Sequence, residues 1–322
     1  MIGSCLMIAL EGPQLLKKER EFIVKNHIAG VTLFQRNIKS YKQISQLNKE
    51  IKSLTKPSPL IAIDMEGGVV NRLSHLKEAG DWPSAESLSH YPSQKVFLTA
   101  KKQACQLKSL GIDLNFAPVV DLPLVKSSIL KTRTFGTEPS AILRTARPFL
   151  KGLAKGGVIP CLKHFPGHGG VQEDSHKTLP VDKRSLKGLK PQLDIFKRLF
   201  ISDFTCIMTA HIEFSKIEKQ PATFSKLLLT QVLRKRLGFE GLIVSDDIDM
   251  KALKSFHPGE SFFLALKAGC DMVITCQNLE SPLKIIDYFE RQSQRKKEIR
   301  KELNRAFKRV GQLKERLNSK TH

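Results

Sequence analysis

Eight short apolar runs recur along the whole chain, and each is separated from the next by a longer segment. Runs that are apolar throughout, without alternating polar residues, are typical of strands buried on both faces of a parallel sheet. The runs cover residues 4–10, 30–34, 59–66, 113–121, 159–166, 206–213, 241–247 and 271–276.

Three of the intervening segments predict amphipathic helices. Residues 41–54, 94–111 and 141–157 have an apolar residue every three or four positions, and the last two end in glycine, a common helix stop. Eight strand–helix units without an obvious linker predict an α/β fold, a single (β/α)8 TIM-type barrel over residues 1–322. A doubly wound open sheet is the alternative.

The composition indicates a soluble globular protein without a membrane span. It is 41% hydrophobic and 26% charged, and no apolar stretch approaches the roughly 20 residues that a membrane helix needs. The apolar residues 1–12 lack a basic region, so we interpret them as a first buried strand and not as a signal peptide; a lipoprotein-like use of Cys5 is the alternative. Six cysteines without a C-x-x-C pair favour a reduced, cytoplasmic protein.

The net charge of +22 is the unusual bulk property. Residues 291–322 alone hold twelve Lys or Arg against three Asp or Glu. This segment also has apolar residues at near-helical spacing, which predicts a basic C-terminal helix over 289–322 packed on the barrel. The apolar residues are Ile299, Leu303, Ala306, Phe307, Val310, Leu313 and Leu317. With one Trp and three Tyr in the whole chain, stacking on bases is poorly supported, so we expect no nucleic-acid partner.

Polar residues follow five of the predicted strands at the point where each strand ends. An aspartate there can cap the next helix, which explains any one case but not five. Active sites of barrels are assembled from residues at the C-terminal ends of several strands, so the pattern predicts an active site. The residues are Asp64, Glu66, Asp121, Lys163, His164, His211, Asp246 and Asp247.

The stretch KHFPGHGGVQEDSHKTLP, residues 163–180, contains His164, His168 and His176 among prolines and glycines that disfavour a helix. A loop rich in ionisable groups commonly carries chemistry. Asp174 lies two residues before His176, so a turn can bring its carboxylate against the imidazole. We expect residues 168–177 to be mobile and to bring His176 into the site when substrate binds. A zinc site of the three histidines and Asp174 is an alternative, but H-E-x-x-H spacing is missing, and we expect no metal and no cofactor.

These motifs together resemble those of glycoside hydrolase family 3, in particular its NagZ-type β-N-acetylglucosaminidases. KHFPGHG and DSH are followed by GLIVSDDIDM, and they are preceded by IAIDMEGG at 61–68, Arg72 and TRTFG at 132–136, in the same order as in that family. Met65 stands where the family usually has Gln. The resemblance runs from about Leu6 to Cys276 and implies one barrel domain without the second domain of longer relatives.

The resemblance implies a retaining glycosidase. Asp246 matches the nucleophile that forms a covalent glycosyl-enzyme, His176 the general acid/base, and Asp174 the carboxylate that orients it. An imidazole suits proton transfer near neutral pH. Positions that match sugar-binding residues are Asp64, Arg72, Arg133, Lys163 and His164. For the two arginines, salt bridges that hold loops are the alternative.

Four further residues have weaker assignments. We expect Asp247 to be structural, through a cap or a hydrogen bond in the strand-end turn. We expect His168 to shape its loop through a side chain–backbone hydrogen bond, and His211 is a candidate substrate contact. Without the family pattern, His164 would be interpreted as a packed core histidine.

The implied protein is a monomeric, cytoplasmic exo-β-N-acetylglucosaminidase of peptidoglycan recycling, cell-wall biogenesis, cell shape and cell division. Its substrate would be a β-1,4-linked GlcNAc-anhydro-MurNAc fragment, with or without peptide. A phosphorylase is one alternative, because a histidine acid/base does not repel a phosphate dianion as a carboxylate does. A basic, non-catalytic protein that binds wall fragments or nucleic acid is another.

Overall fold

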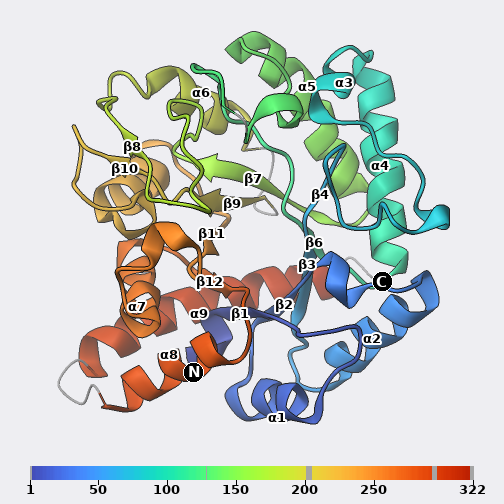
Figure 1. Cartoon of the computed structure of the whole chain (residues 1–322), viewed down its shortest axis with the longest axis vertical. Helices are drawn as coiled ribbons and strands as arrows, with labels where there is room; N and C mark the ends of the chain where they lie inside the picture. Colours follow the sequence, from blue (N-terminus) through green and yellow to red (C-terminus); the bar gives the residue numbers. More distant parts are fainter. Residues whose placement is uncertain (1, 128, 201–204, 292–295, 320–322) are drawn as a thin grey trace.

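Eight parallel strands close on themselves in the order β1-β12-β11-β9-β7-β6-β3-β2, with helices around the outside (Figure 1). The computed structural model describes residues 2–127, 129–200, 205–291 and 296–319. Closure confirms the (β/α)8 barrel and excludes the open sheet. The strands are β1 (Leu6–Ala9), β2 (Gly30–Leu33), β3 (Leu60–Ile63), β6 (Leu114–Asn115), β7 (Ile159–Phe165), β9 (Cys206–Thr209), β11 (Leu242–Asp247) and β12 (Met272–Thr275).

Each apolar run supplies one of these strands, and the three predicted helices are confirmed within two residues at each end. Gly111 and Gly157, which follow α4 and α5, have φ values of +83° and +86°, a region that glycine enters without steric conflict. The helices are α1 (Lys17–Asn26), α2 (Tyr41–Ser53), α3 (Ala85–Ser89), α4 (Ser93–Ser109), α5 (Pro139–Lys155), α6 (Lys190–Arg198), the π-helix η6 (Leu227–Arg236), α7 (Pro258–Ala268), α8 (Glu280–Arg291) and α9 (Lys296–Ser319).

Several strands are shorter than the apolar runs that predicted them, and the runs 59–66 and 113–121 show why. The run 59–66 leaves the barrel after Ile63 and continues into a small hairpin of β4 (Met65–Gly67) and β5 (Val70–Asn71). In the run 113–121, β6 ends at Asn115, and Pro118 lacks the N–H that a central strand needs. The chain touches the barrel again at Val119, which bridges to Lys163.

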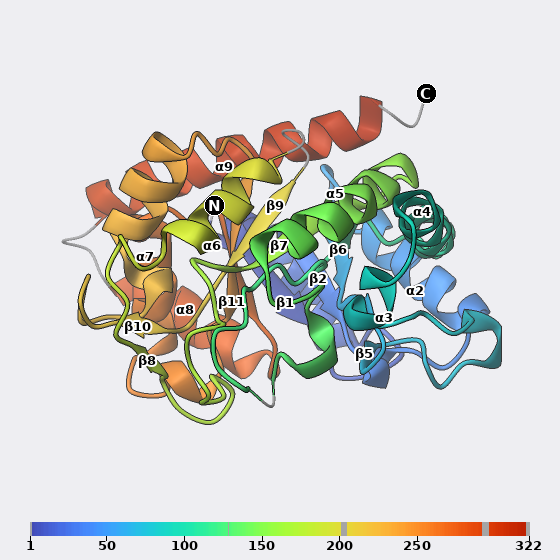
Figure 2. The ribbon, with the colours of Figure 1, turned by 90° about the horizontal axis from the view of Figure 1, so that it is seen from above.

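Helix α9 closes the N-terminal end of the barrel. Val310 and Leu313 are buried in one apolar cluster with Leu60, Ile159 and Met272, which lie at the starts of their strands. Figure 2 shows this helix along one end of the barrel, away from the loops that carry β8 (Val181–Asp182) and β10 (Glu213–Phe214). Of the predicted range 289–322, residues 292–295 and 320–322 lie outside the described residues.

The N-terminus forms a short 3-10 helix, η1 (Ile2–Cys5), and then the buried strand β1. All six cysteines are free thiols, and Cys105 is exposed. Among the described residues, no helix is long and apolar enough to cross a membrane.

Candidate active site

A cavity of about 470 Å³ opens at the C-terminal ends of the barrel strands. This volume lies within the roughly 300–1,000 Å³ that is usual for small-molecule sites. Its wall includes residues in, or directly after, seven of the eight strands, namely Thr32, Asp64, Phe116, Lys163, Met208, Asp246 and Ile274. Polar groups from strands far apart in the sequence therefore meet in one place.

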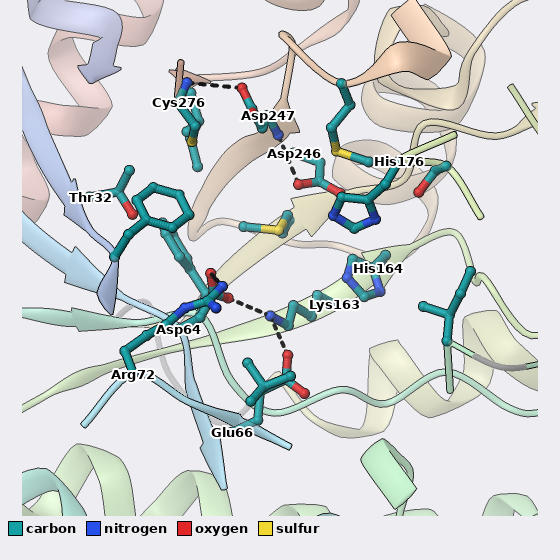
Figure 3. A pocket seen from close by; sticks show the side chains of 18 of the residues that line it. Thr32, Asp64, Glu66, Arg72, Lys163, His164, His176, Asp246, Asp247 and Cys276 are labelled. Carbon is teal, nitrogen blue, oxygen red and sulfur yellow. Dashed lines mark hydrogen bonds and ion pairs between the residues drawn. The ribbon is translucent and has the colours of Figure 1, made fainter. Parts of the chain in front are cut away.

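Two carboxylates and three cations form one network on the side of β3 and β7 (Figure 3). Lys163 Nζ lies 2.8 Å from Asp64 Oδ1 and 2.7 Å from Glu66 Oε1. Arg133 donates from Nε and Nη2 to the two oxygens of Glu66, both at 2.8 Å. Arg72 Nη2 lies 3.4 Å from Asp64 Oδ2. The network fixes five charged side chains with a surplus of one positive charge.

These pairings keep the buried network ionised. Burial alone would raise the pKa of Glu66, but Lys163 and Arg133 lower it to about 2. Burial would likewise raise the pKa of Asp64, which Lys163 and Arg72 hold below its usual range. The pKa of Lys163 is raised despite burial, because Asp64 and Glu66 stabilise the ammonium. Breaking one pair would leave an uncompensated buried charge.

Asp246 and Asp247 end β11 and line the same cavity, but their carboxyl groups have opposite environments. Burial works against ionisation of Asp246, yet His211, His164 and the N–H of Asp247 hold its pKa below the usual value. The Asp247 N–H donates to Asp246 Oδ1 at 2.8 Å. Burial, with Asp249 and Asp246 nearby, raises the pKa of Asp247 to about 8. Near neutral pH, one carboxyl group is therefore ionised and its neighbour is protonated.

His176 reaches the cavity from the loop after β7. Its Nδ1 lies 2.8 Å from Asp174 Oδ1, which also accepts the His176 backbone N–H at 2.9 Å. With Nδ1–H donating to a carboxylate, Nε2 is left for the cavity. The imidazole side chain is 68% exposed. Figure 3 shows it directed toward the same part of the cavity as Asp246.

A buried aspartate holds the base of this loop. Asp121 accepts the backbone N–H of His168 at 2.7 Å, and its Oδ2 lies 2.8 Å from His164 Nδ1. Burial would raise the pKa of Asp121, but His164 and His168 lower it. His164 lines the cavity with its ring held by this carboxylate. The hydrogen-bond partner of His164 Nδ1 is thus the Asp121 side chain and not the barrel backbone.

His211 lies behind the cavity wall and is fully buried. Its Nε2 donates to the Asp247 carbonyl at 3.0 Å, so its Nδ1 accepts from the Thr223 hydroxyl at 2.7 Å. Thr209 Oγ1 lies 2.8 Å from Thr223 Oγ1. Burial lowers the pKa of His211, which favours the neutral ring that this pattern requires. The relay ties the end of β9 to the turn that carries Asp246.

Two expectations about histidines are corrected by this geometry. His211 is not among the residues that line the cavity, so it is not a substrate contact but a support for the turn. The His168 ring makes no side chain–backbone bond in the described part of the chain: its Nε2 lies 3.3 Å from the Ser175 hydroxyl, and its Nδ1 has no hydrogen-bond partner. The backbone of His168 is instead fixed by Asp121.

The residues singled out in the sequence are gathered around this cavity, with Asp174 behind His176. Two further residues were expected at strand ends but were given no role in catalysis or sugar binding. Glu66 and Asp121 end predicted strands, which was the available indication, but their partners lie 67 and 43 positions away in the chain. Within the described ranges, no group of three or more His, Cys, Asp or Glu is arranged to hold a metal ion.

Comparisons with known proteins give one consistent family. The sequence profile described as the glycosyl hydrolase family 3 N-terminal domain matches residues 4–313. The beta-hexosaminidase of Thioalkalivibrio sulfidiphilus is 36% identical over 289 residues, which cover 88% of this chain and 83% of that protein. The beta-hexosaminidase of Chromobacterium violaceum is 37% identical over 287 residues, covering 85% and 79%.

Solved structures agree with the sequence comparisons. Native NagZ from Neisseria gonorrhoeae superposes with a TM-score of 0.82 at 31% identity, covering 96% of this chain and 88% of that one. A glycoside hydrolase family 3 beta-N-acetylglucosaminidase from Paenibacillus sp. str. FPU-7 gives a TM-score of 0.88 at 28% identity. That match covers 98% of this chain but 62% of the Paenibacillus chain, so this chain spans less than two thirds of that enzyme.

Proposed function

This chain belongs to glycosyl hydrolase family 3 and is a glycoside hydrolase of the beta-hexosaminidase type, and on that premise we propose that it is a retaining exo-β-N-acetylglucosaminidase. The observation that carries the proposal is the arrangement of Asp246 and the His176–Asp174 pair around one strand-end cavity. Asp246 is the nucleophile, His176 the general acid/base and Asp174 its orienting partner.

In the first step, an Asp246 carboxylate oxygen attacks the anomeric carbon of the terminal sugar. The glycosidic C–O bond breaks, and protonated His176 gives the Nε2 proton to the departing oxygen. Asp174 accepts from Nδ1–H at 2.8 Å, which fixes the tautomer and stabilises the imidazolium before transfer. The lowered pKa of Asp246, held down against burial by His211, His164 and the N–H of Asp247, keeps the nucleophile anionic.

In the second step, the neutral His176 takes a proton from water as that water attacks the anomeric carbon. The bond to Asp246 breaks, and the sugar leaves with its original anomeric configuration after two inversions. The same imidazole thus acts as acid and then as base, a pair of roles that a histidine side chain can fill near neutral pH.

The ionised network of Lys163, Arg133, Arg72 and Asp64 supplies donors and acceptors at fixed positions for sugar hydroxyls and the 2-acetamido group. His164, oriented by Asp121, adds another polar group to the same wall. Ion pairs that are complete without ligand are already rigid, so binding sugar orders few further side chains. We assign the terminal N-acetylglucosamine to this subsite, in line with the names of the relatives.

The physiological substrate in this proposal is a GlcNAc-anhydro-MurNAc fragment, with or without peptide, cleaved in the cytoplasm during peptidoglycan recycling. The site needs no metal or cofactor for this chemistry. We propose that residues 1–322 act as one barrel domain and a monomer, with the C-terminal basic helix as part of that domain.

The test is release of the aryl group from an aryl β-N-acetylglucosaminide, measured beside the matching β-glucoside and the Asp246→Ala variant. We expect rapid release from the acetamido sugar and loss of that release in the variant. Turnover of the glucoside instead would retain the mechanism but overturn the specificity. The absence of turnover with both substrates would favour a non-catalytic binding protein.

Phosphorolysis is a second candidate on the same residues, and the imidazole in the acid/base position is the observation that favours it. A neutral imidazole does not repel a phosphate dianion as a carboxylate would. Product analysis with and without inorganic phosphate distinguishes the two reactions. Sugar 1-phosphate that appears in proportion to phosphate would replace hydrolysis in the proposal.

A further inference from the structure

A second cavity, of about 810 Å³, lies at the opposite end of the barrel from the active site. Its wall is formed by α9, the segment after α2 and the N-terminus. None of its lining residues belongs to the lining of the active-site cavity. The lining includes the titratable residues His27, Lys56, Lys308, Lys314 and Glu315 and the apolar residues Pro57, Phe307 and Val310.

Lys314 is the unusual member of this wall. It is 8% exposed, and among the described residues no carboxylate lies within 4.0 Å of its ammonium. Asp113 acts on the pKa of Lys314, but its carboxylate already pairs with Lys52 at 2.7 Å and Lys108 at 3.5 Å. A buried cation normally has a partner, because desolvation without one is costly.

The other cations on the inner side of α9 do have partners. Arg309 Nη1 lies 3.1 Å from Asp271 Oδ1, and Arg305 donates to the carbonyls of Leu266 and Cys270. Lys314 therefore departs from the pattern of its own helix. Burial lowers its pKa to about 8, so the ammonium is still the main form at neutral pH.

The surroundings of Lys314 combine positive charge with apolar surface. Lys56 and Lys308 also line the cavity, and Glu315 is the acidic residue in its lining. Phe307, although spaced for the core side of the helix, has 51% of its surface exposed at this cavity. A ligand that satisfies this wall has one anionic group and an apolar body.

We propose that this cavity is a binding site for a small organic carboxylate with an aryl or alkyl body. The carboxylate pairs with Lys314, and the body packs against Phe307, Val310 and Pro57. An extended polyanion fits less well, because its charges are hydrated and evenly spaced, whereas this wall offers one buried ammonium beside apolar side chains. The inference is independent of the glycosidase assignment.

The affinity for the carboxylate should depend on pH through the charge of Lys314. The ammonium that pairs with the carboxylate is present below its pKa, and it is lost as the pH rises above it. The affinity is therefore expected to fall between pH 7 and pH 9.5, by about tenfold or more, while a neutral analogue shows no such change.

Isothermal titration calorimetry on the full chain tests the proposal with benzoate, octanoate and 4-phenylbutyrate, and with the neutral 4-phenylbutanamide. We expect at least one carboxylate to bind and the amide to bind at least about tenfold more weakly. Lys314→Met keeps the aliphatic stem and removes the charge, and it should weaken carboxylate binding by a similar factor. Lys301→Met, an exposed lysine of the same helix outside the cavity, should change the affinity less than about twofold.

Thermal denaturation separates loss of the site from loss of the fold. Because Lys314→Met removes a buried cation without a partner, its melting temperature at pH 7 should equal or exceed that of the wild type. Failure of all three carboxylates to bind would overturn the proposal, as would binding that Lys314→Met leaves unchanged. Competition by heparin at equal charge concentration would also overturn it, in favour of a polyanion surface.

Discussion

At the scale of single residues, the two aspartates that end β11 carry adjacent carboxyl groups with different charge. Asp247 has a pKa raised to about 8 by burial and by Asp249 and Asp246, and its Oδ1 accepts the backbone N–H groups of Asp249 and Cys276 at 3.1 and 3.0 Å. An amide oxygen can accept the same two bonds. The protonated carboxyl group of Asp247 is therefore closely imitated by asparagine, whereas the ionised carboxylate of Asp246 is not.

We expect Asp246→Asn to lower kcat by roughly 10⁴-fold, because a neutral amide cannot form the glycosyl ester. Asp247→Asn should lower kcat by less than about tenfold. The measurement is steady-state kinetics on the aryl β-N-acetylglucosaminide. Equal losses in the two variants would contradict the assignment of Asp246 as the nucleophile.

Stability offers an independent readout of the same pair. The folded-state pKa of Asp247 is raised from 3.8 to about 8, so between these values the folded protein binds more protons than the unfolded chain. The stabilisation of the folded state by protonated Asp247 is therefore fully present below about pH 4, and it is lost as the pH rises through about 8. Asp247→Asn cannot ionise, so its melting temperature relative to the wild type should be higher at pH 8.5 than at pH 5. A difference that is the same at both pH values would count against the raised pKa.

The buried relay of Thr209, Thr223 and His211 predicts a positioning role away from the substrate. Thr223→Val removes the hydroxyl that donates to His211 Nδ1 at 2.7 Å, which releases the imidazole that holds the Asp247 carbonyl. A shift of the nucleophile by a fraction of an ångström should lower kcat by roughly ten- to a hundredfold with little change in KM. Thr223→Ser should restore most of kcat. A purely structural role would give a loss of stability with normal kcat in the folded fraction.

The sequence identifies single candidate residues but does not show which residues far away in the chain they contact. His211 and Asp121 end predicted strands, which marks them as candidates but does not say whether they face the cavity or support it from behind. His211 supports it because Thr223, twelve positions later, folds back behind the wall. Glu66 was expected at a strand end but given no role, because nothing local indicates that Arg133, 67 positions away, and Lys163 both contact it.

At the scale of elements, the loop between β7 and β8 has a fixed base and an exposed tip. Its base is tied to Asp121 through the His168 N–H at 2.7 Å. A Cβ at Gly169 would lie 1.8 Å from the Leu122 carbonyl oxygen, so only glycine fits there. At the tip, Gln172, Glu173 and His176 are exposed. His176, the proposed acid/base residue, thus lies in the exposed part of the loop.

Hydrogen exchange should follow this division. We expect amides of residues 164–170 to exchange slowly and those of residues 172–174 to exchange rapidly in the free protein, because hydrogen-bonded buried amides are protected. Binding of N-acetylglucosamine should slow the tip and leave the base unchanged. Uniform protection from 164 to 177, with and without sugar, would show a rigid loop and would contradict ligand-dependent entry of His176.

Element prediction succeeded where burial on both faces makes a run apolar throughout, and all eight barrel strands have that property. It was wrong where one apolar run serves two purposes. Residues 59–66 combine β3 with the start of the β4–β5 hairpin, and both parts are buried, so hydrophobicity alone contains no boundary between them. The polar Asp64 stands at that boundary, at the point where the chain leaves the barrel.

At the scale of the whole molecule, the two ends of the barrel differ in charge and in purpose. Helix α9 holds nine Lys or Arg against three Asp or Glu, a surplus of six within the chain's +22, and this helix closes the N-terminal end, opposite the active site. The charges that line the cavity are those of the ionised network together with Asp246 and Arg36. The positive charges of α9 are therefore separated from an incoming substrate by the length of the barrel, and salt screens their attraction strongly over that distance.

This separation predicts a small but selective effect of salt on catalysis. For an anionic muropeptide fragment, kcat/KM should fall about two- to threefold between 20 and 300 mM NaCl, since the Debye length shrinks below about 10 Å and only charges at the cavity still act. The neutral aryl β-N-acetylglucosaminide should change less than about 1.5-fold, because it carries no charge to be steered. Initial rates on both substrates over a salt series give the comparison. An equal fall for both substrates would place the effect on the enzyme itself, and a fall of tenfold or more for the anionic one would mean that the distant basic helix steers it after all.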